Sequence, residues 1–344
     1  MKKLLGLFVA LLSVFVIAAC GQSDSSESGV DSEGSEGSEG SEASETTESS
    51  DSYSVALIPK GIGNEFWEVM HNGAKEAAEQ IEADEGIKIN VEYKATASES
   101  DINGQISLVE DFITKGVDAI NIVPQDSKAL YPVLEKAQEQ GIKVVMIDSQ
   151  TDPEIYPYIA TDNIEGGRLA AQEANEVTGG EGKVALLPFL AGASASIERI
   201  QGFEEELENY PGLEVVASEY TESDVNIAMN VTENILTAHP DLAVIYATSP
   251  QSAIGAQQAV NSSGLTEQVK IIGFDTSDKQ IEGVQDGSMH AMIAQNPFKM
   301  GYEGILRSLK LLQGETVKDY LDTGVTIITK ENIDDPEIQE LINP

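Results

Sequence analysis

From about residue 53 onward, short apolar segments alternate with longer amphipathic segments. The apolar segments are rich in β-branched and aliphatic residues, as buried strands are. Between them, residues 65–81 and 101–112 repeat apolar positions at the spacing of one helix face. This alternation predicts parallel sheets that are covered by helices. The predicted strands are Val55–Pro59, Ile87–Tyr93, Ala119–Val123, Lys143–Ile147, Lys183–Leu187, Glu214–Ala217, Ala243–Ala247, Val269–Phe274 and Met289–Ala294.

The strand and helix pattern forms two units in tandem. The first unit ends near Ile159–Thr161, and the second begins at Asp162 with a helix predicted over residues 164–177. No flexible linker separates the two units. Open α/β sheets bind ligands beyond the carboxyl ends of their strands, so two facing units would enclose a polar cleft. The sequence therefore predicts an α/β fold of two doubly wound parallel-sheet domains.

The start of the chain predicts export. Two lysines precede an apolar run over residues 4–19 that is too short for a membrane span, so residues 1–19 are interpreted as a signal peptide. The run ends in Ile17–Cys20, which resembles the lipobox of bacterial lipoproteins. Cys20 is the only cysteine and has no disulfide partner, so we expect it to be lipidated. An ordinary cleaved signal peptide is the alternative.

The segment 20–52 begins with this cysteine and is otherwise almost entirely Ser, Glu, Gly, Asp and Thr. It has too little apolar surface to form a core, so we interpret it as a solvated tether spanning about 30 Å. The chain as a whole has a formal net charge of −39. This charge argues against nucleic acid as a partner. It also argues against a basic membrane-binding patch, which leaves acyl chains as the predicted attachment.

The motifs of enzymes are incomplete in this chain. Gly61–Phe66 lacks the third glycine of a dinucleotide fingerprint, and Gly192–Ser196 lacks the closing glycine of a nucleophile elbow. The three histidines lie far apart, without the spacing of metal ligands. We therefore expect a binding protein with no catalytic residues, no cofactor and no metal. A secreted enzyme remains an alternative that would need an acid–base pair or a nucleophile.

Residues suited to sugar recognition stand at the predicted strand ends. Sugars are held by aromatic faces and by amides and carboxylates that pair with hydroxyls. Phe66 and Trp67 open the first predicted helix, although Phe66 also fits core packing. Asp148 and Asp275 directly follow predicted strands, where an aspartate also serves as a helix N-cap, and Gln295 lies at the end of another strand.

Several short segments across the folded part of the chain carry a family resemblance. They are Asn64–Trp67 with Gly73–Ala74, Val144–Asp148, Ala160–Asn163 with Gly166–Gly167, Gly202–Phe203, Leu236–Pro240, Ile272–Asp275 and Ile293–Gln295. Together they resemble the periplasmic sugar-binding proteins of the ribose-binding type, which serve ABC transporters. The resemblance extends from about Val55 to Leu321.

The resemblance implies a type I periplasmic-binding-protein fold with a three-crossing hinge near Thr161, Gln295 and Val325. The implied domains are residues 53–161 with 296–325, and residues 162–295 with 326–344. A ligand between the domains would shift an open-to-closed equilibrium, and an ABC permease with its cytoplasmic ATPase would recognise the closed form. We expect a lipid-anchored monomer on the extracytoplasmic face of the bacterial cell membrane.

The binding positions of the family match this chain unevenly. Ser149 and Ile197 stand where the family has arginines, and Ser249 stands where it often has asparagine. The loss of two cations argues against ribose itself and for another sugar or polyol. The predicted ligand contacts are Lys60, Asn64, Phe66, Trp67, Asp148, Ser149, Ser249, Asp275 and Gln295.

A second resemblance leaves the ligand open. Ile58–Lys60, Gly104–Gln105 and Asp148–Ser149 are similar to the autoinducer-2-binding branch of the same family. This similarity implies that Lys60 and the aspartate hold a hydrated furanosyl ligand, although Lys60 also fits a solvated rim position. A sensory binding protein that presents its closed form to a receptor kinase is a further alternative.

Overall fold

The computed structural model describes residues 52–154 and 156–343, which belong to one compact unit. The predicted signal peptide, the predicted lipidation site Cys20 and nearly all of the predicted tether lie outside the described residues. Within the described part of the chain, no helix has both the length and the apolar character that crossing a bilayer requires.

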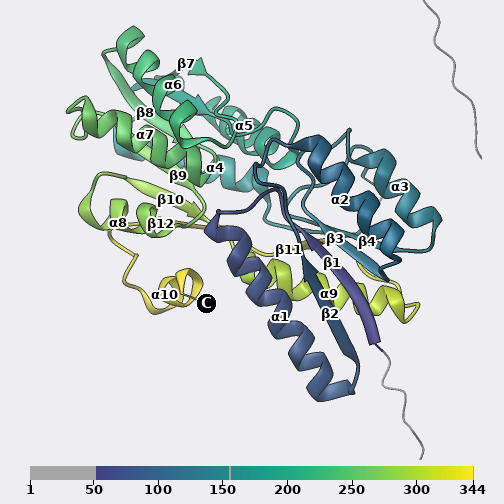
Figure 1. The fold of residues 1–344 in the computed structure, drawn as a ribbon. Coiled ribbons are helices and arrows are strands. Elements are labelled where there is room, and N and C mark those ends of the chain that lie inside the picture. Colours follow the sequence, from purple (N-terminus) through teal and green to yellow (C-terminus); the bar gives the residue numbers. More distant parts are fainter. Residues whose placement is uncertain (1–51, 155, 344) are drawn as a thin grey trace, which may run out of the picture. The chain divides into compact units, whose positions relative to one another are not determined.

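The first sheet has six parallel strands in the order β11-β5-β4-β3-β1-β2 (Figure 1). Both of its faces are buried, because alternate residues of a strand point in opposite directions. Leu57 packs in the cluster with α1 and α9, and its neighbour Ile58 packs in the cluster with α2 and α3. The strands are β1 (Ser52–Ile58), β2 (Lys88–Tyr93), β3 (Ala119–Ile122), β4 (Lys143–Ile147), β5 (Tyr158–Ala160) and β11 (Tyr320–Asp322). The helices are α1 (Glu65–Glu85), α2 (Ile102–Lys115), α3 (Tyr131–Glu139) and α9 (Pro297–Leu312).

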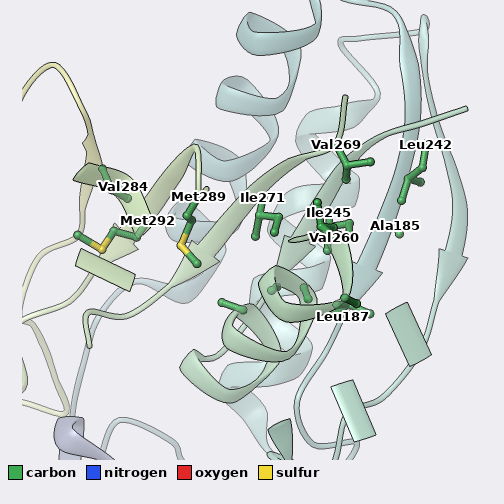
Figure 2. Packing of buried hydrophobic residues seen from close by; sticks show 14 of the residues in the cluster. Ala185, Leu187, Leu242, Ile245, Val260, Val269, Ile271, Val284, Met289 and Met292 are labelled. Atoms are coloured by element: carbon green, nitrogen blue, oxygen red, sulfur yellow. The ribbon is translucent and has the colours of Figure 1, made fainter. Parts of the chain in front are cut away.

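The second sheet has the order β12-β10-β9-β8-β6-β7, and only β12 pairs in the antiparallel sense. Leu187 belongs to the cluster with α6, α7, α8 and α10, while Leu186 packs on the opposite face with α4 and α5 (Figure 2 shows the first cluster). The strands are β6 (Gly182–Leu187), β7 (Leu213–Ser218), β8 (Leu242–Ala247), β9 (Lys270–Phe274), β10 (Ala291–Ala294) and β12 (Thr326–Thr329). The helices are α4 (Asn163–Thr178), α5 (Ser194–Leu207), α6 (Val225–Ala238), α7 (Pro250–Ser262), α8 (Asp278–Asp286) and α10 (Pro336–Ile342).

The chain passes between the two sheets three times. It leaves the first sheet after β5, returns to it with α9 and β11, and joins the second sheet again with β12. The Thr161 hydroxyl donates to the Gly324 carbonyl at 2.9 Å, so two of these crossings lie side by side. The predicted fold class of two doubly wound α/β domains is confirmed, while the residue boundaries assigned to the domains stay a prediction.

All nine predicted strands are present, with ends displaced by a few residues at most. The sequence analysis did not predict β5, β11, β12 or α10. These four elements are only three to seven residues long, too short to show a hydrophobic period. Pairing and packing with neighbouring elements stabilise them.

Candidate functional site

A small cavity lies where the loops after the strands of both sheets meet. Parallel strands bring their carboxyl ends to one edge of a sheet, which places these loops together. From the first sheet and its helices it is lined by Lys60, Asn64, Phe66, Trp67, Glu99 and Asp148. From the second it is lined by Phe189, Arg199, Ser249, Pro250, Gln251 and Asp275.

Asp148 and Asp275 occupy equivalent positions in the two sheets. Each follows a strand with its backbone in the left-handed region, at φ values of 60° and 69°. The amide of Asp148 donates to Ile159 O and that of Asp275 to Ile293 O, both at 2.8 Å. The chain therefore bends at the same point after β4 and after β9, and neither aspartate is the N-cap of a helix.

Lys60 and Asp148 form a buried ion pair. Lys60 Nζ lies 2.6 Å from Asp148 Oδ2 and donates to Ser149 Oγ at 2.7 Å. The Lys60 residue is only 1% exposed, so its charge has lost almost all contact with bulk water. Two charges removed from water are tolerated only when each is paired and hydrogen-bonded. Lys60 is thus a structural partner of Asp148 and does not lie at a solvated rim.

Arg199, on α5, extends this pair into a chain of alternating charges. Its guanidinium lies 3.8 Å from Asp148 and 3.9 Å from Asp275, between the two sheets. It also stacks on the Phe274 ring at 3.6 Å, and it donates to Asn163 Oδ1 at 2.9 Å. A planar guanidinium with five donors suits this position, because it satisfies several acceptors at once.

The two aspartates have opposite pKa shifts. Burial raises the pKa of Asp148, but the charges of Lys60 and Arg199 outweigh burial and hold it below its usual value. Burial raises the pKa of Asp275 to about 6, and Arg199 and the Gln295 amide oppose this rise only in part. Arg199 lies almost equally far from both carboxylates, so the difference comes mainly from Lys60.

Aromatic side chains from both sheets flank the charges. Phe66 and Trp67 meet edge to face with their ring centres 4.7 Å apart. Lys60 Nζ lies 5.4 Å from the centre of the Trp67 ring and 5.2 Å from that of Phe189, within the range of a cation–π interaction. The cavity therefore has apolar walls beside its charged groups.

Buried amides hold the loops of the first sheet in place. The Gln105 amide donates to Pro59 O at 3.1 Å and to Val123 O at 2.8 Å. The Gln125 amide donates to Lys60 O and, at 2.8 Å, to the Thr96 hydroxyl. Buried backbone carbonyls need such donors. The network fixes the backbone of Lys60, and hence the origin of its side chain.

The structure has its cleft closed. Three hydrogen bonds join loops and helix ends of the first sheet's part to those of the second. The bonds run from Ser127 N to Gly192 O (2.9 Å), from Gln150 N to Ser194 Oγ (2.9 Å) and from Asp278 N to Glu65 Oε2 (3.0 Å). They involve loop and helix-end groups outside the cavity lining, so closure does not depend on the cavity residues alone.

Comparison with known proteins places this chain in a family. A family model described as "Periplasmic binding protein domain" matches residues 55–316. The chain belongs to the periplasmic binding proteins. Within that family it is of the ribose-binding type and of the sugar-binding ABC transporter solute-binding class, as the sequence analysis expected. Membership implies a location outside the cytoplasm.

Relatives and solved structures agree on this class. The D-ribose/D-allose-binding protein of Pseudomonas aeruginosa is 32% identical, over 80% of this chain and 88% of its own. The ribose import binding protein of Escherichia coli is 30% identical over 81% and 91%. A solute-binding protein from Agrobacterium vitis with bound D-fucose is 34% identical with a TM-score of 0.80, over 84% and 99%.

The predicted contact residues of this periplasmic binding protein fall into two groups. Ser149 and Gln295 lie behind the cavity and hydrogen-bond to Asp148 and Asp275, respectively. Of the others, Ser249 also accepts a hydrogen bond from the backbone near the start of α7. The residues that line the cavity directly are Lys60, Asn64, Phe66, Trp67, Asp148, Ser249 and Asp275.

The sequence analysis missed Glu99, Phe189 and Arg199. Its expectation that the site loses two cations needs correction, because Lys60 and Arg199 both line the cavity. Ile197, the position compared with a family arginine, is 47% exposed and does not line the cavity. Arg199 lies two residues further along α5, on a face that packs closely against α4. No local pattern in the sequence marks Arg199 as buried, because the groups that surround it come from distant segments.

We predict that Asp148→Asn lowers the free energy of unfolding by about 3–5 kcal/mol, because it leaves Lys60 buried without its close counter-ion. Adding Lys60→Met should recover part of this loss, so the two changes should be strongly non-additive in urea unfolding. The exposed pair Lys136 and Glu110, 3.4 Å apart, is the control, and its cycle should give less than about 1 kcal/mol. Additive effects at Lys60 and Asp148 would contradict the buried pair.

We predict that Asp275→Asn changes how stability depends on pH. The pKa of Asp275 is raised on folding, so its contribution is complete below about 4 and is lost as the pH rises through about 6. Relative to the variant, wild type should therefore lose about 2 kcal/mol between pH 4 and pH 7. Urea unfolding across this range measures the difference. The exposed Asp334→Asn is the matched control, and parallel curves for wild type and Asp275→Asn would refute the assignment.

Proposed function

We propose that this protein captures one monosaccharide, or a polyol of similar size, in the cavity between its two sheets and delivers it to an ABC permease. The observation that carries this proposal is the combination of aromatic walls with buried, fixed charges in one small cavity. The cavity is small and is lined by residues of both sheets, which suits one small ligand better than an oligosaccharide.

The lining groups match the two surfaces of a sugar. Trp67 and Phe189 offer flat apolar surface for its C–H faces. The carboxylates of Asp148 and Asp275 accept hydrogen bonds from hydroxyls, and Lys60 and Arg199 donate to hydroxyl oxygens. Because the charged groups already hold one another in position, little ordering free energy is lost when the ligand binds.

Binding to residues of both sheets couples ligand capture to the closed form that the permease recognises. A ligand that contacts both sides favours the closed arrangement over an open one, and the free-energy difference between the two complexes sets the shift. The permease with its cytoplasmic ATPase would then recognise the closed form. We propose that the protein acts as a monomer, since one chain supplies both walls of the cavity.

The ligands in the names of the relatives support a sugar. They include ribose, allose and xylitol among the sequence relatives and D-fucose and D-arabinose among the solved structures. The comparisons do not favour autoinducer-2 or a sensory role. The relatives are sugar-binding transport proteins, which also disfavours the alternative of a secreted enzyme.

We propose further that Cys20 is lipidated after removal of residues 1–19 and that residues 20–52 tether the folded unit to the outer face of the cell membrane. The lipobox-like Ile17–Cys20 and the acidic composition of the following segment support this attachment. An acidic protein gains nothing from anionic lipid headgroups, so acyl chains are the better anchor.

We predict that at least one of D-ribose, D-allose, D-arabinose, D-fucose and xylitol raises the melting temperature of the protein. A ligand present at 100 times its Kd stabilises the folded state by about 2.7 kcal/mol. Asp275→Asn should abolish the rise, whereas the exposed Asp334→Asn should retain it. A shift with autoinducer-2 alone would keep the binding mode and overturn the sugar.

We predict that Cys20→Ala abolishes incorporation of radiolabelled palmitate and moves the protein from the membrane fraction to the medium, or leaves it unprocessed. The test is labelling followed by fractionation in the native host. Ser23→Ala, beside the same cleavage site, is the control and should remain labelled. Continued labelling of the Cys20 variant would refute the anchor.

A further inference from the structure

Glu99 is a buried carboxylate that the proposed sugar contacts do not use. It lies in the loop between β2 and α2, lines the cavity and is 8% exposed. Its Oε1 accepts hydrogen bonds from Asn64 Nδ2 at 3.0 Å and from Trp67 Nε1 at 2.8 Å. One oxygen of Glu99 therefore holds both the side-chain amide of Asn64 and the indole of Trp67.

The charge of Glu99 has no counter-ion. Across residues 52–154 and 156–343, no lysine, arginine or histidine nitrogen lies within 4.0 Å of its carboxylate, and Oε2 has no hydrogen-bond partner. Oε2 lacks a donor from the protein but is not among the fully buried atoms without a partner, so it is an acceptor that a ligand in the cavity can reach.

The cations of the cavity are already engaged. Lys60 pairs with Asp148, and Arg199 lies between Asp148 and Asp275. With Glu99 included, the lining carries three carboxylates against two cations. A ligand carboxylate would meet the uncompensated charge of Glu99 and cations whose charge the aspartates already balance, whereas a ligand hydroxyl would donate to Oε2.

The backbone around Glu99 fixes this arrangement. A Cβ atom at Gly61 would lie 2.9 Å from Glu99 Cγ and 3.1 Å from Glu99 N, so the loop after β1 approaches Glu99 as closely as glycine permits. The Thr96 hydroxyl donates to Lys60 O at 2.9 Å and ties the two loops together. The carboxylate is therefore held in place before a ligand arrives.

We propose that Glu99 determines specificity: its Oε2 accepts a ligand hydroxyl and restricts the cavity to uncharged sugars and polyols, against their carboxylate counterparts. This inference rests on the proposed sugar-binding function and narrows its substrate class. Asp148 and Asp275 each have a cation within 4.0 Å, whereas Glu99 has none among the described residues, and its Oε2 is left to accept from the ligand.

The test compares wild type, Glu99→Gln and the control Glu139→Gln, an exposed residue of α3 with the same change of charge. The probes are D-ribose, D-allose, D-galactose and D-glucose, with D-galacturonate and D-glucuronate as the acidic counterparts of the last two. Affinities come from calorimetry. Trp67 is the only tryptophan, so its emission reports directly on the Oε1 contact.

We expect wild type and Glu139→Gln to bind a neutral sugar and neither uronate. Glu99→Gln keeps an amide oxygen for Asn64 and Trp67 but places a donor where Oε2 was. It should lose about tenfold to a hundredfold in affinity for that sugar, with Trp67 emission unchanged and with weaker discrimination against uronates.

Two results would overturn the assignment while sugar binding stands. The first is binding of a uronate by wild type. The second is an unchanged affinity of Glu99→Gln for the neutral sugar. Loss of binding together with altered Trp67 emission would reduce Glu99 to a positioning residue and also overturn the direct contact. If no probe binds wild type, the proposed sugar function fails and Glu99 loses its role with it.

Discussion

The closed arrangement of the two sheets brings together a buried sequence of charges from Lys60 through Asp148 and Arg199 to Asp275. Each of these charges would be costly alone, because burial removes its hydration. Each has an opposite charge beside it, and the neighbours come from both sheets. Lys60–Asp148 lies within the first unit and Arg199–Asp275 within the second, so only the Arg199–Asp148 contact joins the two sheets. A shift of either sheet would break that contact, which therefore favours the closed position of the two cavity walls.

The fold supplies this geometry through its strand ends. Asp148 and Asp275 use the same left-handed bend and the same bond from their amide to the adjacent strand, once in each sheet. The crossings after β5 and β10 let two such sheets face each other within one chain. The amides of Gln105 and Gln125 then fix the loop that carries Lys60. The ionic contacts thus form between side chains whose backbone is already fixed by hydrogen bonds.

Sequence alone predicted two kinds of feature. They are the elements that local hydrophobic periodicity determines and the ligand contacts that lie beyond the carboxyl ends of parallel strands. Strand patterns placed Asp148 and Asp275 at sheet edges, and the helix start placed Trp67 beside them. The same reasoning could not predict Arg199, because an arginine in an amphipathic helix normally faces water, and here the partners that bury it come from distant segments. Glu99 was missed for the same reason, since its donors lie more than thirty residues away.

The different states of the two aspartates give the cavity two kinds of acceptor. Asp148 is held ionised by Lys60 and Arg199, so it offers a fixed negative charge that a hydroxyl can approach without changing the protonation of the site. Asp275 has a pKa of about 6 and changes its charge near neutral pH. A hydroxyl that donates to Asp275 stabilises its ionised form, and by linkage ionisation of Asp275 must strengthen binding of that hydroxyl. Acidification to below pH 6 should therefore weaken the contact at Asp275 while the one at Asp148 persists.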